Sequence, residues 1–144
     1  MSSKFLISIA ILLAALVSGC VSVPMASPEQ DAAARSFAVR PGKANIYVYR
    51  NEIFGTALRL PVALDGKLVG DTAINTFLVL EVSPGSHTIQ SKTENGATVT
   101  INAVAGQSYY VWQEVKMGAR AALHHVDEAT GRAAVNECKL VASL

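Results

Sequence analysis

From residue 44 onward, apolar and polar residues alternate in short runs that are separated by turn-forming dipeptides. A period of two places successive side chains on opposite faces, so each run predicts a half-buried β-strand. Asp65-Gly66, Pro84-Gly85 and Asn95-Gly96 supply the backbone freedom that tight turns require. Roughly seven or eight short strands, with a turn about every ten residues, are typical of an antiparallel β-sandwich or small barrel. We therefore predict an all-β domain over residues 43–144.

Two runs refine this prediction. The run from Leu58 to Leu64 has a clean apolar face but contains Pro61. Proline has no backbone N–H to donate to a neighbouring strand, so Pro61 predicts an edge strand or a β-bulge. The run from Phe77 to Val82 is nearly all apolar, which indicates a strand covered on both faces. The fold class that we predict is an antiparallel β-sandwich, immunoglobulin-like or transthyretin-like.

The last segment of the chain is ambiguous. Its apolar positions follow Thr130-Gly131 and fit either a short helix or a final strand: Ala133, Val135, Leu140 and Val141. We expect a short C-terminal helix of about two turns that packs against a sheet. Asp127-Glu128, just before this segment, is interpreted as a solvated turn.

The first twenty residues carry the pattern of a secretory signal. Lys4 gives a positive start, and Phe5 to Val17 form an uncharged apolar run of roughly 13 residues, too short for a spanning helix. Small residues follow and end at Gly19-Cys20. This arrangement resembles the lipobox of bacterial lipoproteins, which implies cleavage between Gly19 and Cys20 and acylation of Cys20. We expect residues 1–19 to be the signal peptide.

Residues 20–42 are expected to be a lipidated N-terminus and a tether, because no periodic apolar face follows Cys20. Within this segment Ser27-Pro28-Glu29-Gln30 matches a capping box, and the alanines that follow favour a short helix to about Arg35. Each buried methylene of an acyl chain contributes about 0.8 kcal/mol, so two or three chains would hold the protein at a membrane. The membrane is therefore a predicted partner, reached through lipid.

Charge provides no second route to a membrane or to nucleic acid. The chain has 12 Lys and Arg against 11 Asp and Glu, and loss of Lys4 with the signal balances the two signs. No run is rich in lysine or arginine, so we expect no nucleic-acid partner. Once Cys20 carries lipid, Cys138 has no partner within the chain. We interpret Cys138 as a buried small hydrophobe, the alternatives being a reactive thiol or a link to another chain.

No residue pattern identifies a reaction. His124 and His125 are adjacent, so on a strand without a bulge they point to opposite faces and cannot both bind one metal ion. Nothing in the spacing of His87 and Cys138 is typical of metal ligands. No nucleophile elbow surrounds a serine or cysteine, and no glycine-rich loop leads into a helix to bind phosphate. We therefore predict a non-enzymatic protein with no catalytic residue, no metal site and no cofactor.

Aromatic residues form the one pattern that suggests a binding surface. Tyr47 and Tyr49 share one face of a predicted strand, and Tyr110 and Trp112 share one face of another. If the two strands are neighbours, the four rings line one surface. An exposed row would be a platform for a glycan or a partner protein. The alternative is that the C-terminal segment or the second sheet covers the row.

Two arginines near these strands are candidate ligands for a negatively charged group. Arg50 and Arg59 would flank the aromatic face and bind a carboxylate or phosphate through paired N–H groups. In the alternative interpretation, each arginine pairs with a nearby acid such as Glu52 or faces water. A surface pair of that kind contributes only about 0–1 kcal/mol.

A series of short motifs then occurs in order along the chain. It consists of Phe37, Ala44–Arg50, Val62–Gly70, Pro84–Ile89, Tyr109–Val111 and Val126–Arg132. Over residues 37–140 this series resembles the family of bacterial lipoproteins called domain of unknown function 2846. The resemblance implies an envelope lipoprotein with a sandwich fold, and it brings no catalytic residue. The segment Leu64–Ile89 is also similar to modules of surface proteins that are envelope-associated or carbohydrate-linked.

These observations predict a lipid-anchored protein of the bacterial cell envelope, a non-catalytic structural or protein-interaction module whose partner is another envelope protein. Val21 stands where an aspartate tends to retain lipoproteins in the inner membrane of enteric bacteria, so we expect the periplasmic face of the outer membrane. The alternative is a glycan or small-ligand binding module that uses the candidate face: Tyr47, Tyr49, Tyr110 and Trp112. A third hypothesis is an enzyme of unrecognised type.

Overall fold

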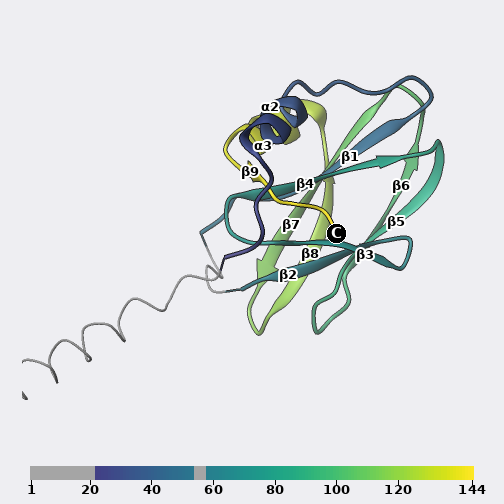
Figure 1. The fold of residues 1–144 in the computed structure, drawn as a ribbon. Coiled ribbons are helices and arrows are strands. Elements are labelled where there is room, and N and C mark those ends of the chain that lie inside the picture. The colour runs from purple at the N-terminus through teal and green to yellow at the C-terminus, as the bar shows by residue number, and fades with distance from the viewer. Residues whose placement is uncertain (1–21, 54–57) are drawn as a thin grey trace, which may run out of the picture.

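The computed structural model of the protein describes residues 22–53 and 58–144 (Figure 1). Two β-sheets face each other in this part of the chain, and two short helices lie side by side against the larger sheet (Figure 1). The prediction of an all-β sandwich with a short C-terminal helix is therefore confirmed. The expected signal peptide, with the cleavage and lipidation positions Gly19 and Cys20, lies outside the described residues.

The larger sheet has the strand order β8-β7-β1-β4-β9, and the smaller sheet has the order β3-β2-β5-β6. The larger sheet comprises β1 (Ala44–Arg50), β4 (Thr76–Val82), β7 (Ser108–Lys116), β8 (Arg120–Val126) and β9 (Lys139–Leu140). The smaller sheet comprises β2 (Leu60–Leu64), β3 (Lys67–Thr72), β5 (Gly85–Ser91) and β6 (Thr98–Ala103). The predicted antiparallel pairing holds except in the larger sheet, where β1 pairs with β7 and β4 with β9 in parallel. Between β1 and β7 the chain crosses to the smaller sheet and back twice, and such a long connection permits parallel pairing.

The main core lies between the two sheets, where side chains from alternating positions meet. Ile46 and Val48 of β1 face Val62, Ile89 and Ile101 of the smaller sheet, and each of these side chains is at most 1% exposed. Full burial of an aliphatic side chain contributes roughly 1.5–3 kcal/mol. This set follows the period-two pattern of the sequence, because the inward-facing positions of each strand are the apolar ones.

A polar bridge crosses this core. The Thr72 hydroxyl donates to Gln113 Oε1 at 2.5 Å, and Gln113 Nε2 donates to Ser91 Oγ at 2.7 Å. All three residues are fully buried. Burial of an unpaired amide or hydroxyl costs about 1–3 kcal/mol, so the mutual hydrogen bonds make a polar group tolerable at this position.

β2 contains Pro61 and yet lies between two other strands, β3 and β5. Its pairing with β3 shifts register between Val62 and Ala63, directly after the proline. The predicted bulge is therefore confirmed, and the edge-strand alternative is wrong. The Pro61 carbonyl still accepts a hydrogen bond from the Lys92 N–H at 2.8 Å, so the proline lacks only its donor.

The predicted two-residue turn joins β2 to β3. Asp65 and Gly66 have φ angles of 51° and 85°, the positive values that such a turn demands. The Asp65 carboxylate accepts a hydrogen bond from the Thr88 N–H at 2.8 Å and lies 2.7 Å from His87 Nδ1. The other ring nitrogen of His87 lies 2.6 Å from the Ser83 carbonyl oxygen. Two acceptors therefore flank the imidazole and favour its protonated form.

The N-terminal part of the described chain agrees with the sequence prediction in one respect and differs from it in another. The predicted capping box is confirmed at the start of α2 (Pro28–Ala34), where Gln30 N–H donates to Ser27 Oγ at 3.2 Å. The expected tether, however, packs on the domain: Val23 is 6% exposed, and Met25 forms a β-bridge with Val141. Among the described helices, none has both the length and the apolar character needed to cross a bilayer.

The C-terminal segment contains both structures that the sequence left open. α3 (Glu128–Asn136) comes first and β9 follows it. Asp127 and Glu128 are exposed, as expected, but the predicted turn is wrong, because Asp127 is the N-cap of α3 and accepts a hydrogen bond from the Thr130 N–H at 2.9 Å. Aspartate is common both in turns and at N-caps, and only the packing of the following residues separates the two.

The His87–Asp65 pair predicts a dependence of stability on pH. The hydrogen bond to Asp65, together with the one to the Ser83 carbonyl, raises the pKa of His87 above 6.5, and the same contact lowers the pKa of Asp65 below 3.8. The His87 contribution is therefore complete below about pH 6.5 and is lost as the pH rises through the raised pKa. The Asp65 contribution is present above pH 3.8 and is lost as the pH falls through the lowered pKa.

Thermal melts from about pH 5 to pH 9 will test this pair. We expect the wild-type Tm to fall by about 2–5 °C across this range, the size typical of a partly exposed pair, and H87Q to flatten the profile. H125Q is the matched control, because His125 is exposed and its ring contacts Tyr109 at a centroid distance of 5.9 Å. Identical pH profiles for H87Q and the wild type would contradict the assignment.

Candidate functional site

The structure brings the four aromatic residues of the candidate face together. β1 and β7 are neighbours, with Tyr47 opposite Tyr110 and Tyr49 opposite Trp112. The rings of Tyr47 and Tyr110 stack, with centroids 5.1 Å apart and planes inclined by 12°. The alternation in each strand placed the rings on one face, and the parallel pairing of the two strands aligned them.

This face is covered. The exposures of Tyr47, Tyr49 and Tyr110 are 1%, 2% and 1%, because α2 and α3 lie over this side of the larger sheet (Figure 1). Ala134 and Val135 of α3 pack on the rings. Three of the four rings are therefore buried, and the exposed row considered in the sequence does not form. The C-terminal segment, the cover foreseen as the alternative, supplies α3, and the N-terminal segment supplies α2.

Trp112 is the member of the face that stays partly accessible. Its indole N–H donates to Glu52 Oε2 at 2.9 Å, and its ring stacks on His124 with centroids 5.1 Å apart. A shallow hollow of ≈ 320 Å³ lies beside it, with Tyr49 and Glu137 among its walls. One half-buried indole on a shallow hollow is what remains of the predicted platform.

The two candidate arginines do not form an anion site. Arg50 is fully buried, and its Nη1 donates to the carbonyl oxygens of Leu58 at 2.8 Å and Thr72 at 3.4 Å. Burial lowers the pKa of Arg50, although the nearby Glu52 carboxylate partly opposes this shift. Arg59 lies 3.6 Å from Asp71 and also donates to the Ser22 carbonyl oxygen. Both arginines therefore bind parts of the protein itself.

The other candidate groups are also engaged in structural contacts. Cys138 is 1% exposed and its thiol donates to the Arg50 carbonyl oxygen at 3.3 Å, so the interpretation as a buried small residue is confirmed. Burial raises the pKa of the Cys138 thiol to about 12. His124 Nε2 lies 2.7 Å from Glu114 Oε2, whereas the ring of His125 contacts Tyr109. Across residues 22–53 and 58–144, no group of three or more potential metal ligands is close enough to hold an ion.

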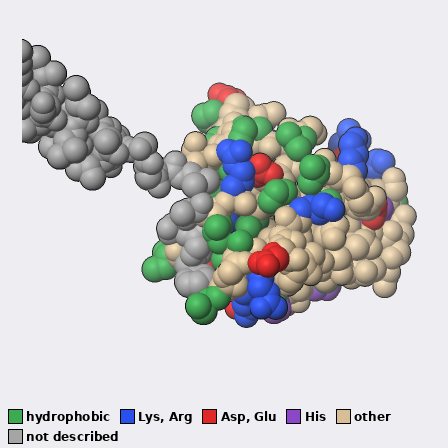
Figure 2. Space-filling view, turned by 90° about the horizontal axis from the view of Figure 1, so that it is seen from below, with side chains coloured by type: hydrophobic (Ala, Val, Ile, Leu, Met, Phe, Trp, Pro, Cys, Tyr) green, Lys and Arg blue, Asp and Glu red, His purple; other side chains and the backbone are tan. Residues whose placement is uncertain are grey.

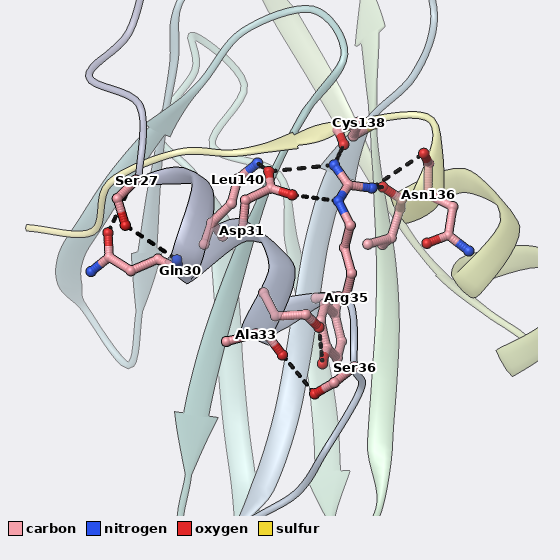
Figure 3. Close-up of polar contacts among 12 residues, drawn as sticks. Ser27, Gln30, Asp31, Ala33, Arg35, Ser36, Asn136, Cys138 and Leu140 are labelled. Atoms are coloured by element: carbon pink, nitrogen blue, oxygen red, sulfur yellow. Dashed lines mark hydrogen bonds and ion pairs between the residues drawn. The ribbon is translucent and has the colours of Figure 1, made fainter.

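Arg35, which was not among the candidate residues of the sequence, holds the two helices over the aromatic face (Figure 3). Arg35 follows α2, and its Nη1 donates to the carbonyl oxygens of Val135 at 3.1 Å and Asn136 at 3.2 Å. Its Nη2 donates to the Cys138 carbonyl oxygen, and its Nε pairs with Asp31. The last carbonyls of a helix lack partners within that helix, so one guanidinium both satisfies the end of α3 and attaches α2 to it.

Asp31 completes this cluster, which we call the Arg35 clamp: Asp31, Arg35, Val135, Asn136, Cys138 and Leu140. The second carboxylate oxygen of Asp31 accepts a hydrogen bond from the Leu140 N–H of β9 at 2.7 Å. The hydrogen bond from Arg35 lowers the pKa of Asp31, so the carboxylate is held in its charged form. The spacing of Asp31 and Arg35 by four residues is the only sequence signal for the clamp, because its carbonyl partners lie about 100 residues further along the chain.

Backbone hydrogen bonds extend this junction between the two ends of the described chain. Ala26 N–H donates to the Leu140 carbonyl at 3.1 Å, and Ala142 N–H donates to the Pro24 carbonyl at 2.9 Å. The C-terminal Leu144 N–H reaches the Val69 carbonyl of β3 at 3.0 Å. The residues before α2 therefore form a strap that is bound to the domain along its length.

The fold and this site define a class: a small all-β sandwich whose aromatic face is closed by helices from both ends of the chain. Residues 40–126 match the family described as "Protein of unknown function (DUF2846)", and the chain belongs to this family. An uncharacterized protein of Haemophilus influenzae is 30% identical over 136 residues, which covers 91% of this chain and 81% of the relative. No solved structure matches the chain. The family resemblance is confirmed, and α3 lies beyond the matched residues.

The contact between α3 and the aromatic face predicts an unusual effect of a glycine substitution. A Cβ atom added to Gly131 would lie 2.2 Å from Cγ of Tyr110. We expect G131A to destabilise the protein by about 1–3 kcal/mol through overpacking, although alanine favours a helix over glycine by about 1 kcal/mol. A133G, at an exposed position of α3, measures helix propensity alone. If urea unfolding shows that G131A is stabilising, the described packing is wrong.

The Arg35 clamp depends on the shape of the guanidinium as well as on its charge, so we expect that a lysine cannot replace Arg35. R35K keeps a cation beside Asp31 but cannot donate to three carbonyl oxygens at once. We expect R35K to lower the free energy of unfolding by about 1–3 kcal/mol, since hydrogen bonds to a charged group are lost, and to speed hydrogen exchange of the α2 amides. R40A is the control, because the Arg40 side chain is 71% exposed and pairs with Glu81 at the surface. Equal effects of R35K and R40A would refute a special role for Arg35.

Proposed function

We propose that the protein is a lipid-anchored component of the bacterial cell envelope that acts as a non-catalytic structural or protein-interaction module. The observation that carries this proposal is the sequence Val17-Ser18-Gly19-Cys20, which ends an uncharged apolar run. Acylation of Cys20 would attach the chain to a membrane, and Val21 favours the periplasmic face of the outer membrane. The partner in this proposal is another envelope protein.

The engagement of reactive groups supports a structural role. Cys138 is buried with its thiol pKa raised to about 12, so it is poorly suited to nucleophilic chemistry. Arg50 binds backbone carbonyls, and His87 binds a carboxylate and a carbonyl. The glycan-binding alternative loses its main support, because Tyr47 and Tyr110 are buried beneath the helices.

The two cysteines provide a matched test of lipid attachment. We expect wild-type protein and C138A to incorporate a clickable palmitate analogue in growing cells, because Cys20 remains, and C20A to incorporate none. Membrane fractionation of the same cells should place the first two with the outer membrane and should release C20A. Incorporation of label into C20A, or failure of the wild-type protein to incorporate any, would refute the proposal.

A further inference from the structure

One end of the sandwich gathers several chain segments. β1 and β7 run parallel, so the residues after Arg50 and after Lys116 leave the larger sheet at the same end. The Val115 N–H donates to Glu52 Oε1 at 3.0 Å, which joins these two segments. β2 also begins here, since Leu60 packs with Val115 and Ala121. We call this the anchor end, defined by residues 51–53, 58–60 and 116–120.

The described chain begins at the anchor end. The Ser22 carbonyl oxygen accepts a hydrogen bond from Arg59, the residue before β2. Ser22 and Met25 also line a hollow of ≈ 430 Å³ together with Asn75, which precedes β4. β4 is antiparallel to β1, with Thr76 opposite Arg50, so Asn75 belongs to the same end. The strap therefore starts at the end where β1 and β7 finish (Figure 1).

Large apolar side chains are exposed at this end. Met25, Ile53 and Met117 are 46%, 79% and 80% exposed. Ile53 and Met117 follow neighbouring strands, which lie about 5 Å apart, and Met25 lies on the strap. Figure 2, seen from below the view of Figure 1, shows hydrophobic side chains interspersed with charged ones on this side of the molecule. Exposed apolar groups that share one end of a domain indicate an interaction surface.

The short stretch of chain between Cys20 and Ser22 indicates which partner this surface contacts. Cys20 lies two residues before Ser22, and two residues span at most about 7 Å. A leaflet's headgroup layer is about 5–8 Å thick. A lipid on Cys20 would therefore keep Ser22 at the membrane surface and leave no room for a protein between the anchor end and the bilayer.

We propose that the anchor end rests on the membrane, with Met25, Ile53 and Met117 inserted among the lipid headgroups. This inference rests on the proposed function, because it takes Cys20 as the site of the lipid. The proposed contact is apolar, because the exposed side chains that carry it are hydrophobic. Two of the basic groups at this end pair with acids: Lys116 with Glu114 at 2.7 Å and Arg59 with Asp71 at 3.6 Å. Methionine side chains are flexible and suit a disordered interface.

Site-specific labelling of the acylated protein can test this contact. M117C would be purified and labelled with the environment-sensitive fluorophore NBD, and the labelled protein would then be reconstituted into phosphatidylcholine vesicles. Acylation blocks the Cys20 thiol, and burial protects Cys138. V104C is the matched control, because Val104 is 59% exposed and lies at the opposite end of the sandwich. The nearby Gly106 N–H donates to the carbonyl oxygen of Lys43, the residue before the start of β1. The nine residues of β7 between the two labels span about 30 Å.

We expect NBD at position 117 to shift to the blue on reconstitution and to lose at least half of its emission to doxyl-labelled lipids. NBD at position 104 should do neither. The results should be the same with anionic phosphatidylglycerol vesicles. If position 117 stays as accessible to water as position 104 in a protein whose mass includes acyl chains, the inference is wrong and the proposed function stands. A blue shift at position 117 that requires an added envelope protein also overturns it, and absence of acyl mass overturns both proposals.

Discussion

The larger sheet has two apolar faces, and the fold depends on covering both. All seven residues of β1 are buried, which a single packed face cannot achieve. The smaller sheet covers the aliphatic side of β1, and α2 and α3 cover the aromatic side. Helices as short as these are marginal in isolation, so their stability comes from the rings beneath them. The Arg35 clamp holds both helices to that surface, because one planar cation meets the carbonyl oxygens at the end of α3 and the carboxylate of α2.

Covering the aromatic face in this way brings the two ends of the described chain together. The strap pairs with the C-terminal segment, and β9 adds to the larger sheet beside β4. Segments that look like a tether and a tail are thus parts of the core. Their chemistry is correspondingly structural: Asp31 is held charged by Arg35, and Cys138 is shielded from solvent.

The packing of the strap on the domain also affects how a lipid on Cys20 would position the protein relative to a membrane. A free tether of some twenty residues would let the domain move tens of ångströms from the membrane. In the proposed arrangement, the bound strap would remove that freedom and bring one end of the sandwich to the bilayer. The proposed orientation therefore follows from packing of the strap, and the exposed side chains at the anchor end are suited to that position.

The sequence by itself determined the features that depend on neighbouring residues. The alternation predicted the strands, Asp65-Gly66 the turn between β2 and β3, Ser27 and Gln30 the capping box, and Pro61 a bulge, because each signal acts within a few residues. Only the tertiary structure decided the parallel pairing of β1 with β7, the burial of Tyr47 and Tyr110, and the partners of Arg35. These contacts join residues that are about 60 to 100 positions apart, and local patterns carry no information about which distant surface will cover an apolar face. The aromatic face illustrates the division: the sequence placed four rings on one side, and the fold decided that two helices would close over three of them.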